Sequence, residues 1–345
     1  MVRALSSSDV GSRVVVRRKV GPLYTDLLGY LKEITNDAVV VLTDSGEVRV
    51  PLDEVHRAKR IPPNPIARLE EAAASAWPAV EVQWLGQWRL RASSGYTGRA
   101  NSVLPLGYPG MPLLQAVEHA EEFYRARGLP ARIDIPLPLS ARVVPAVTQA
   151  GWRVDCEVLI QTIALDRLIA ATTGGCTLSA TPSPAALAII SGRHARRIIA
   201  GPAGDLPRGD PADLAGAPRT LPEAAMHVLT AVPQLQFAEY AEPLARPAGI
   251  AARSPRASAE SGSLLAMGRG AVTDGYLGLF AVETIEAARR QGLAQRIVGT
   301  LARWADSVGA STAYLQVEST NTSAIALYEK LGFRTHHRYV RYRKD

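Results

Sequence analysis

A short basic stretch near the end of the chain, R-R-Q-G-L-A-Q from Arg289 to Gln295, has the composition of an anion-binding turn. It runs into an apolar-periodic segment, Gly292–Val308, which predicts a helix. The start of a helix leaves backbone N–H groups unpaired and carries the positive end of the dipole. Gly292 lets an anion approach the backbone, and arginine donates in a fork that suits phosphate. By itself the stretch fits a solvated helix start better than a phosphate site, so the elements around it decide between the two.

A second run, N-T-S-A-I-A-L-Y-E-K-L-G-F from Asn321 to Phe333, follows the predicted strand Thr312–Glu318. Its spacing predicts a helix over Asn321–Leu331, ended at Gly332. On that helix Tyr328 shares a face with apolar residues, as a core aromatic would. The basic turn, two helices and a strand thus form one ordered set.

The elements that must position these residues come from the same part of the chain. Paired strands around the turn V-T-D-G are predicted at Leu264–Arg269 and Gly275–Thr284. After the second helix, Phe333–Arg334 and Arg338–Tyr342 predict a hairpin-like pair. A strand, a basic glycine loop and a helix in succession are the arrangement that builds an anion site.

The middle of the chain predicts a mixed α/β layer, because strands and helices alternate there. The predicted helices are Ile66–Trp77, Leu113–Arg127 and Ala141–Ala150, and the predicted strands are Val80–Ala92, Ala100–Leu106, Ala131–Ile135 and Arg153–Ile163.

The first part of the chain reads as β structure. Short apolar runs are separated by turn signals, of which D-S-G at Asp44–Gly46 predicts a hairpin. Several short strands in succession predict a small barrel, and the proline-rich Ile61–Pro65 predicts a linker.

Two segments rich in Gly, Pro, Ala and Ser, Gly201–Thr220 and Ala245–Ser261, are predicted to be poorly ordered. Between them, Leu221–Thr230 predicts a helix and Gln234–Tyr240 a strand.

Composition bounds the class of protein. A chain of 345 residues predicts two or three domains, and 47% hydrophobic with 21% charged residues is typical of a soluble globular protein. No apolar run is long enough to span a bilayer, and MVRALSSSDV lacks the apolar core of a signal peptide. Cys156 and Cys176 fit neither a disulfide framework nor a metal site. We therefore expect a cytoplasmic protein without a membrane segment or a metal.

The formal net charge of +7 favours anionic partners, such as phosphorylated cofactors or acidic substrates. Non-specific nucleic-acid binding also fits this charge, but basic residues on solvated faces explain it better, so nucleic acid is not an expected partner.

The ordered set of motifs resembles the GNAT superfamily of acyl-CoA-dependent N-acetyltransferases. R-R-Q-G-L-A matches the pyrophosphate loop of that family, with Ala294 in place of its second glycine. The Asn321…Ala324…Leu327-Tyr328…Leu331-Gly332-Phe333 run is the second match, and together they cover Leu264 to Arg343. The resemblance implies a GNAT fold with a mixed central sheet and acetyl-CoA as cofactor.

The resemblance also implies roles for individual residues. The backbone of Val282 and Thr284 would pair with pantetheine as with a neighbouring strand. Asn321, together with Ala324, would contact the pantetheine arm, and Tyr328 would face the thioester sulfur. The pyrophosphate would be held by Arg289, Arg290, Gln291, Gly292, Leu293, Ala294 and Gln295.

The chemistry of aminolysis defines two catalytic roles. The departing thiolate needs a proton, and a phenol of pKa about 10 can donate to a thiolate whose acid has pKa about 8.5. Tyr328 is therefore the expected general acid, with a core aromatic as the alternative. A carboxylate could take the amine proton, and Glu318 is the first choice, with Glu283 and Asp274 as alternatives. Gly278 stands where some family members carry a glutamate, so the base stays open.

The middle region repeats the C-terminal order in weaker form. Ala100–Ile163 lacks the R-x-x-G-x-A loop and the Asn/Tyr pair, while A-G-W-R at Ala150–Arg153 mirrors L-G-F-R at Leu331–Arg334. It looks like a degenerate GNAT half. With W-R-L-R, the run G-Y-T-G-R-A-N-S-V resembles an actinobacterial group of two-part GNAT proteins with an N-terminal small Src-homology-type barrel. The polar residues of that run either line a substrate cleft or satisfy a turn: Arg99, Asn101 and Ser102.

The expected architecture is α/β (α+β), with a barrel at 1–60, a degenerate GNAT half at 66–165 and an acetyl-CoA-binding GNAT domain at 175–345. The expected function is acetyl transfer from acetyl-CoA to a primary amine on a small molecule or protein, with a homodimer allowed. The alternative is a non-catalytic acyl-CoA sensor or nucleic-acid-associated protein, suggested by the open base assignment and by the basic residues Arg13, Arg17, Arg18 and Lys19.

Overall fold

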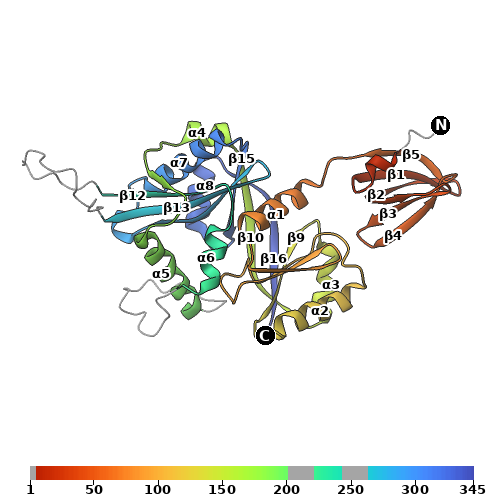
Figure 1. Ribbon diagram of the computed structural model, residues 1–345, viewed down its shortest axis with the longest axis horizontal. Helices are drawn as coiled ribbons and strands as arrows, with labels where there is room; N and C mark the ends of the chain where they lie inside the picture. The colour runs from red at the N-terminus through yellow and green to blue at the C-terminus, as the bar shows by residue number, and fades with distance from the viewer. Residues whose placement is uncertain (1–4, 201–220, 243–262) are drawn as a thin grey trace, which may run out of the picture.

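A computed structural model of the chain describes residues 5–200, 221–242 and 263–345. These residues form two β-sheets, one of five strands and one of eleven (Figure 1). The segments predicted to be poorly ordered, Gly201–Thr220 and Ala245–Ser261, lie outside the described residues. Within those ranges, none of the helices combines the length and apolar character needed to cross a membrane.

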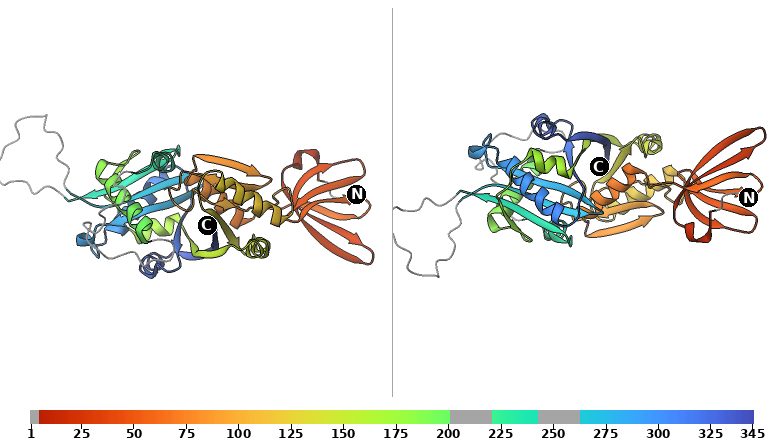
Figure 2. Two further views of the ribbon diagram at one scale, coloured as in Figure 1. Left: turned by 90° about the horizontal axis from the view of Figure 1, so that it is seen from below. Right: turned by 90° about the horizontal axis from the view of Figure 1, so that it is seen from above.

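The smaller sheet is antiparallel, with strand order β4-β3-β2-β1-β5, and lies at one end of the molecule (Figure 2). Alternate residues of a strand face opposite sides, so Val14 and Val16 of β1 are buried in a valine-rich core. Thr43 pairs with Gly46, which confirms the predicted hairpin. The elements are η1 (Ser7–Asp9), β1 (Arg13–Val20), β2 (Leu23–Ile34), β3 (Ala38–Thr43), β4 (Gly46–Pro51) and β5 (Val55–Arg60).

The larger sheet has the order β11-β12-β13-β14-β15-β10-β16-β9-β8-β7-β6. The pairs β14–β15 and β8–β9 are parallel, and the other neighbours are antiparallel. Its strands are β6 (Glu81–Leu85), β7 (Trp88–Ala92), β8 (Val103–Leu104), β9 (Ala131–Leu137), β10 (Arg153–Ala164), β11 (Thr177–Ser179), β12 (Leu235–Ala241), β13 (Leu264–Thr273), β14 (Tyr276–Thr284), β15 (Thr312–Glu318) and β16 (Arg334–Lys344).

The helices around this sheet begin largely where the sequence predicts. Asn64 caps the first one, since its Oδ1 accepts from the backbone N–H of Ile66 at 2.9 Å. The helices are α1 (Pro65–Ala76), α2 (Leu113–Arg125), η2 (Ala141–Val143), α3 (Val144–Gln149), α4 (Leu165–Ala171), α5 (Pro184–Ala200), α6 (Glu223–Thr230), η4 (Glu286–Ala288), α7 (Leu293–Ser307) and α8 (Thr322–Lys330).

The hairpin predicted at Phe333–Arg334 and Arg338–Tyr342 is wrong. Residues Arg334–Lys344 form one strand, β16, which pairs with β10 on one side and β9 on the other. Both partners come from the middle region, so the segment stays extended instead of folding back on itself. In turn, β10 is inserted between β15 and β16. The middle and C-terminal regions therefore share one sheet through exchanged strands (Figure 1).

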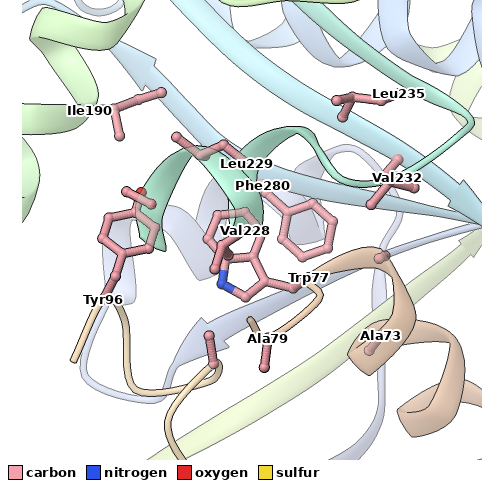
Figure 3. Packing of buried hydrophobic residues seen from close by; sticks show 14 of the residues in the cluster. Ala73, Trp77, Ala79, Tyr96, Ile190, Val228, Leu229, Val232, Leu235 and Phe280 are labelled. Carbon is pink, nitrogen blue, oxygen red and sulfur yellow. The ribbon is translucent and has the colours of Figure 1, made fainter. Parts of the chain in front are cut away.

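The C-terminal part of the sheet is covered on both faces. On one face, α4, α7 and α8 enclose a core that includes Leu301, Leu315 and Phe333. On the other face, α1, α5 and α6 enclose a core with Trp77, Phe280 and Tyr314 (Figure 3). In the middle region, α2 and α3 pack on β7 and β9. The strands β14 and β15 contribute residues to both cores of the C-terminal part.

A buried ion network joins β16 to the middle region. The Asp134 carboxylate on β9 accepts from Arg341 Nε at 2.7 Å and from Arg341 Nη2 at 3.0 Å. It also accepts from Ser102 Oγ at 2.8 Å and from Arg91 Nη2 at 3.4 Å. All four side chains are buried. The network fixes the C-terminal strand in the sheet.

Candidate acyl-transfer site

The strands β14 and β15 separate partway along their length. Their parallel pairing runs from Tyr276 opposite Thr312 to Leu279 opposite Leu315 and then ends, although both strands continue. Between the pairs Met267–Glu283 and Arg269–Phe280, β14 advances by three residues while β13 advances by two. Because Ala281 also has a φ of 47°, β14 carries a bulge there. A bulge bends its strand. The edge of β14 from Ala281 to Thr284 is thus left without a partner strand among the described residues.

The start of α7 lies next along the chain from this edge. Its N-cap is Gly292, with a φ of 75°, and no side chain from the part of the chain that the structure describes caps the first turn. The first backbone bond inside the helix is donated by the Arg296 N–H to the Gly292 carbonyl at 3.1 Å. The N–H groups of the first turn are therefore left for a ligand, and glycine tolerates the left-handed conformation that brings the chain there.

The predicted pyrophosphate residues differ in what their side chains do. Arg289, Arg290 and Gln291 are exposed, and Arg289 lies 3.7 Å from Glu286 in a loose ion pair. Gln295 is engaged elsewhere, because its Nε2 donates to the Ala171 carbonyl of α4 at 2.8 Å. Gln295 can therefore bind an anion only through its backbone N–H. The same holds for Leu293, which is buried, and for Ala294, which is half-buried.

The residues predicted to reach pantetheine lie on both sides of the opening. Val282 and Thr284 are half-buried on the unpartnered edge of β14. Asn321 caps α8, since its Oδ1 accepts from the Ala324 N–H at 3.2 Å. This leaves the Asn321 amide nitrogen for other contacts.

Tyr328 lies on α8 in the core beneath the opening. Its ring meets Phe333 edge-on with centroids 5.5 Å apart, as expected for a core aromatic. Burial raises the pKa of Tyr328 to about 12, while Arg193 lowers it and Glu283 raises it. The phenol therefore lies within electrostatic reach of charges on β14 and α5, and it keeps its proton at neutral pH.

The three carboxylates considered as a base occupy different places. Glu283 forms an ion pair with Arg193 near Tyr328. Glu318 is half-buried at the end of β15, beside the opening. Asp274 lies in the turn at the other end of β14, where it is held 2.8 Å from Arg68. The structure thus brings Glu283 and Glu318 to the opening and does not bring Asp274 there.

Of the polar residues in the middle region, Asn101 satisfies a turn. Its Oδ1 accepts from the N–H groups of Ser93 and Gly95, at 2.8 and 3.0 Å, and its Nδ2 donates to two carbonyls of the same loop. Ser102 belongs to the Asp134 network. Arg99 instead lies over the Trp77 and Phe280 rings, at 5.3 and 5.4 Å from their centroids.

Sequence reasoning missed the residues on the far side of the opening. Arg193 lies in a helix that was not predicted, so nothing marked it. Arg269 was placed in a strand, but a charge in the buried run M-G-R-G-A was a signal that went unused.

The splayed parallel strands, the uncapped helix after the first of them and the capped helix after the second define the GNAT class of acyltransferases. The chain belongs to the family described as "Probable histone acetyltransferase Rv0428c C-terminal", which matches residues 64–343. It is an N-acetyltransferase of the GNAT type, and the relatives favour an enzyme over a non-catalytic module.

Two relatives and one solved structure illustrate the similarity. The chain is 29% identical to the probable histone acetyltransferase Rv0428c of Mycobacterium tuberculosis, over 96% of this chain and 95% of that protein. It is 27% identical to the uncharacterized N-acetyltransferase YobR of Bacillus subtilis, over 78% of this chain and 94% of that protein. A GCN5-related N-acetyltransferase from Kribbella flavida shares the fold, with a TM-score of 0.50, 17% identity, and coverage of 81% and 96% of the two chains.

Proposed function

We propose that the protein transfers the acetyl group of acetyl-CoA to a primary amine, which attacks the thioester directly. The observation that carries this proposal is the parting of β14 from β15 beside the uncapped start of α7. A pantetheine arm is extended and has amide groups, so it can pair with the free edge of β14 as a strand would. The pyrophosphate then meets the first turn of α7.

Different residues would bind different parts of acetyl-CoA. The backbone at Val282 and Thr284 would pair with pantetheine, and Asn321 and Ala324 would border the arm. The pyrophosphate would accept from the N–H groups at the start of α7, and the exposed guanidinium groups of Arg289 and Arg290 would supply charge.

The reaction needs one proton donor and one acceptor. The amine nitrogen attacks the thioester carbonyl carbon, the C–S bond breaks, and the sulfur takes a proton from the Tyr328 hydroxyl, which the proton lost by the new amide nitrogen then restores. An alkylammonium has a pKa near 10.4, so a base must first remove its proton. Glu318 would do so, directly or through water. Glu283, which forms an ion pair with Arg193, is the alternative.

Amine-dependent release of free thiol from acetyl-CoA, matched by an equal amount of acetylated amine in mass spectra, tests this function. The acceptors should include small amines and a lysine peptide, because the family description names histones. Thiol release that no acceptor accelerates would point to slow hydrolysis and contradict the proposal. We further propose that the enzyme works in the cytoplasm.

Reversing the charge of the loop should weaken acetyl-CoA binding. The double variant Arg289→Glu, Arg290→Glu loses two charge-assisted contacts, and we expect affinity to fall on the order of 100-fold at low salt. Titration calorimetry measures this change. Arg57→Glu with Lys59→Glu on β5 is the matched control, since both residues are exposed and the charge change is the same. Equal acetyl-CoA affinity in both double variants would show that the loop is an ordinary helix start and does not bind the pyrophosphate.

A further inference from the structure

A buried guanidinium lies on the face of the sheet opposite α7. Arg269 of β13 has no solvent exposure, and its Nε donates to the Leu229 carbonyl of α6 at 2.8 Å. Neither Nη1 nor Nη2 makes a hydrogen bond within the described residues. Burial lowers the pKa of Arg269 to about 9, because the charged form is held away from water.

The alternation of side chains along β13 determines which face of the sheet Arg269 lies on. The neighbouring Gly268 and Gly270 face α7, where an added Cβ would come within 2.5 Å of Ile297 and 2.9 Å of Leu301. These glycines let α7 approach closely, and Arg269 must then face α6. A hydrophobic residue would fill that core position at no electrostatic cost. A buried guanidinium whose Nη1 and Nη2 make no hydrogen bond within the described residues is therefore better explained by a ligand that binds them.

The surroundings of Arg269 are aromatic and cationic. Its Cζ lies 4.9 Å from the Trp77 ring centroid and 5.1 Å from that of Phe280, and these two rings stack beneath α6 (Figure 3). Arg99 approaches the same two rings. Tyr96 lies within electrostatic reach of both arginines, which lower a phenol pKa that burial raises to about 12. The two guanidinium groups thus converge on one aromatic pair.

This cluster borders the opening between β14 and β15. Arg269 pairs across the strands with Phe280, which immediately precedes the bulge at Ala281. A cavity of about 10 Å³, which is room for about one water molecule, lies against Trp77 and Arg99 of this cluster, and its lining also includes Gln316, Glu70 and Asp134. Gln316 follows the last residue of β15 that pairs with β14. The cluster therefore lies on the acceptor side of the proposed reaction centre, opposite α7 and α8.

We propose that Arg269, assisted by Arg99, receives a carboxylate of the acceptor, so that the acceptor is an amine that also carries a carboxylate, such as an amino acid. The inference rests on the proposed function. The two free nitrogen atoms at the end of one guanidinium match the two oxygen atoms of a carboxylate. The stacked rings beside them suit the apolar part of such an acceptor.

The test compares amino acids with the amines that result from their decarboxylation: β-alanine with ethylamine, phenylalanine with phenethylamine, and lysine with cadaverine. We expect at least one amino acid to exceed its partner on the order of 100-fold in kcat/KM, because loss of a charged hydrogen-bonded group costs that much. In Arg269→Met the ratio should fall toward one through KM, with acetyl-CoA affinity unchanged. Arg338→Met, at an exposed ion pair, is the control.

Arg269→Lys keeps the charge but not the fork, and it covers the case in which Arg269→Met does not fold. We expect it to lose about 10-fold of the preference. The inference is wrong if no pair in the panel shows a carboxylate preference, including the case of no turnover, or if the preference survives in the folded variants. Failure of acetyl-CoA to bind would instead contradict the proposed function, so the two failures are distinguishable.

Discussion

Replacing Asp134 by alanine should lower the free energy of unfolding of the larger sheet by about 3–5 kcal/mol, the usual cost of leaving a buried charge without its partner. Arg341 would lose both of its bonds to this carboxylate, at 2.7 and 3.0 Å, and Arg91 would lose its nearby anion. Burial lowers the pKa of Arg341, while Asp134 raises it well above its usual value, so removing Asp134 takes away the main interaction that offsets the burial of this charge.

Urea unfolding followed by tryptophan fluorescence measures this loss. All five tryptophans lie beyond the small sheet, the first being Trp77, so the signal reports on the larger one. The control is Glu157→Ala, which breaks an exposed pair with Arg338 on the same sheet and should cost less than about 1 kcal/mol. Similar costs for the two variants would show that the Asp134 network does not fix β16 in the sheet.

Replacing Tyr328 by phenylalanine should lower kcat on the order of 100-fold while acetyl-CoA affinity stays the same. Phenylalanine keeps the edge-on contact with Phe333, so the change removes the proton donor and little packing. Because burial raises the pKa of Tyr328 to about 12, the phenol stays protonated below that value. We therefore expect no loss of kcat from Tyr328 ionisation between about pH 7 and 10.

Steady-state rates of thiol release, with affinities from calorimetry, check this prediction. Tyr342→Phe, at a partly buried residue packed against the core of the middle region, is the control and should leave kcat unchanged. A kcat in Tyr328→Phe equal to that of the unchanged enzyme would assign Tyr328 to packing alone.

The local elements of the site could be predicted because their signals are local. The apolar periodicity of α7 and the strand Thr312–Glu318 are confirmed, the strand to the residue. Gly292 before α7 and Asn321 before α8 are residue types that commonly cap helix N-termini, so they predict these helix starts.

The long-range features could not be predicted in this way. The place of β16 between β10 and β9 depends on partners more than 170 residues earlier in the chain, and its own residues do not encode them. The bulge that separates β14 from β15 centres on Ala281, a residue that gives no sign of its positive φ. The helices α4 and α5 were also missed, and Arg193 with them.

Titration calorimetry with acetyl-CoA tests the central claim, that the opened edge of β14 and the start of α7 together form a coenzyme site. We predict one acetyl-CoA per chain, because the middle region lacks the R-x-x-G-x-A loop, with a dissociation constant on the order of 1–100 µM. Absence of binding, or two equivalent sites per chain, would contradict the account.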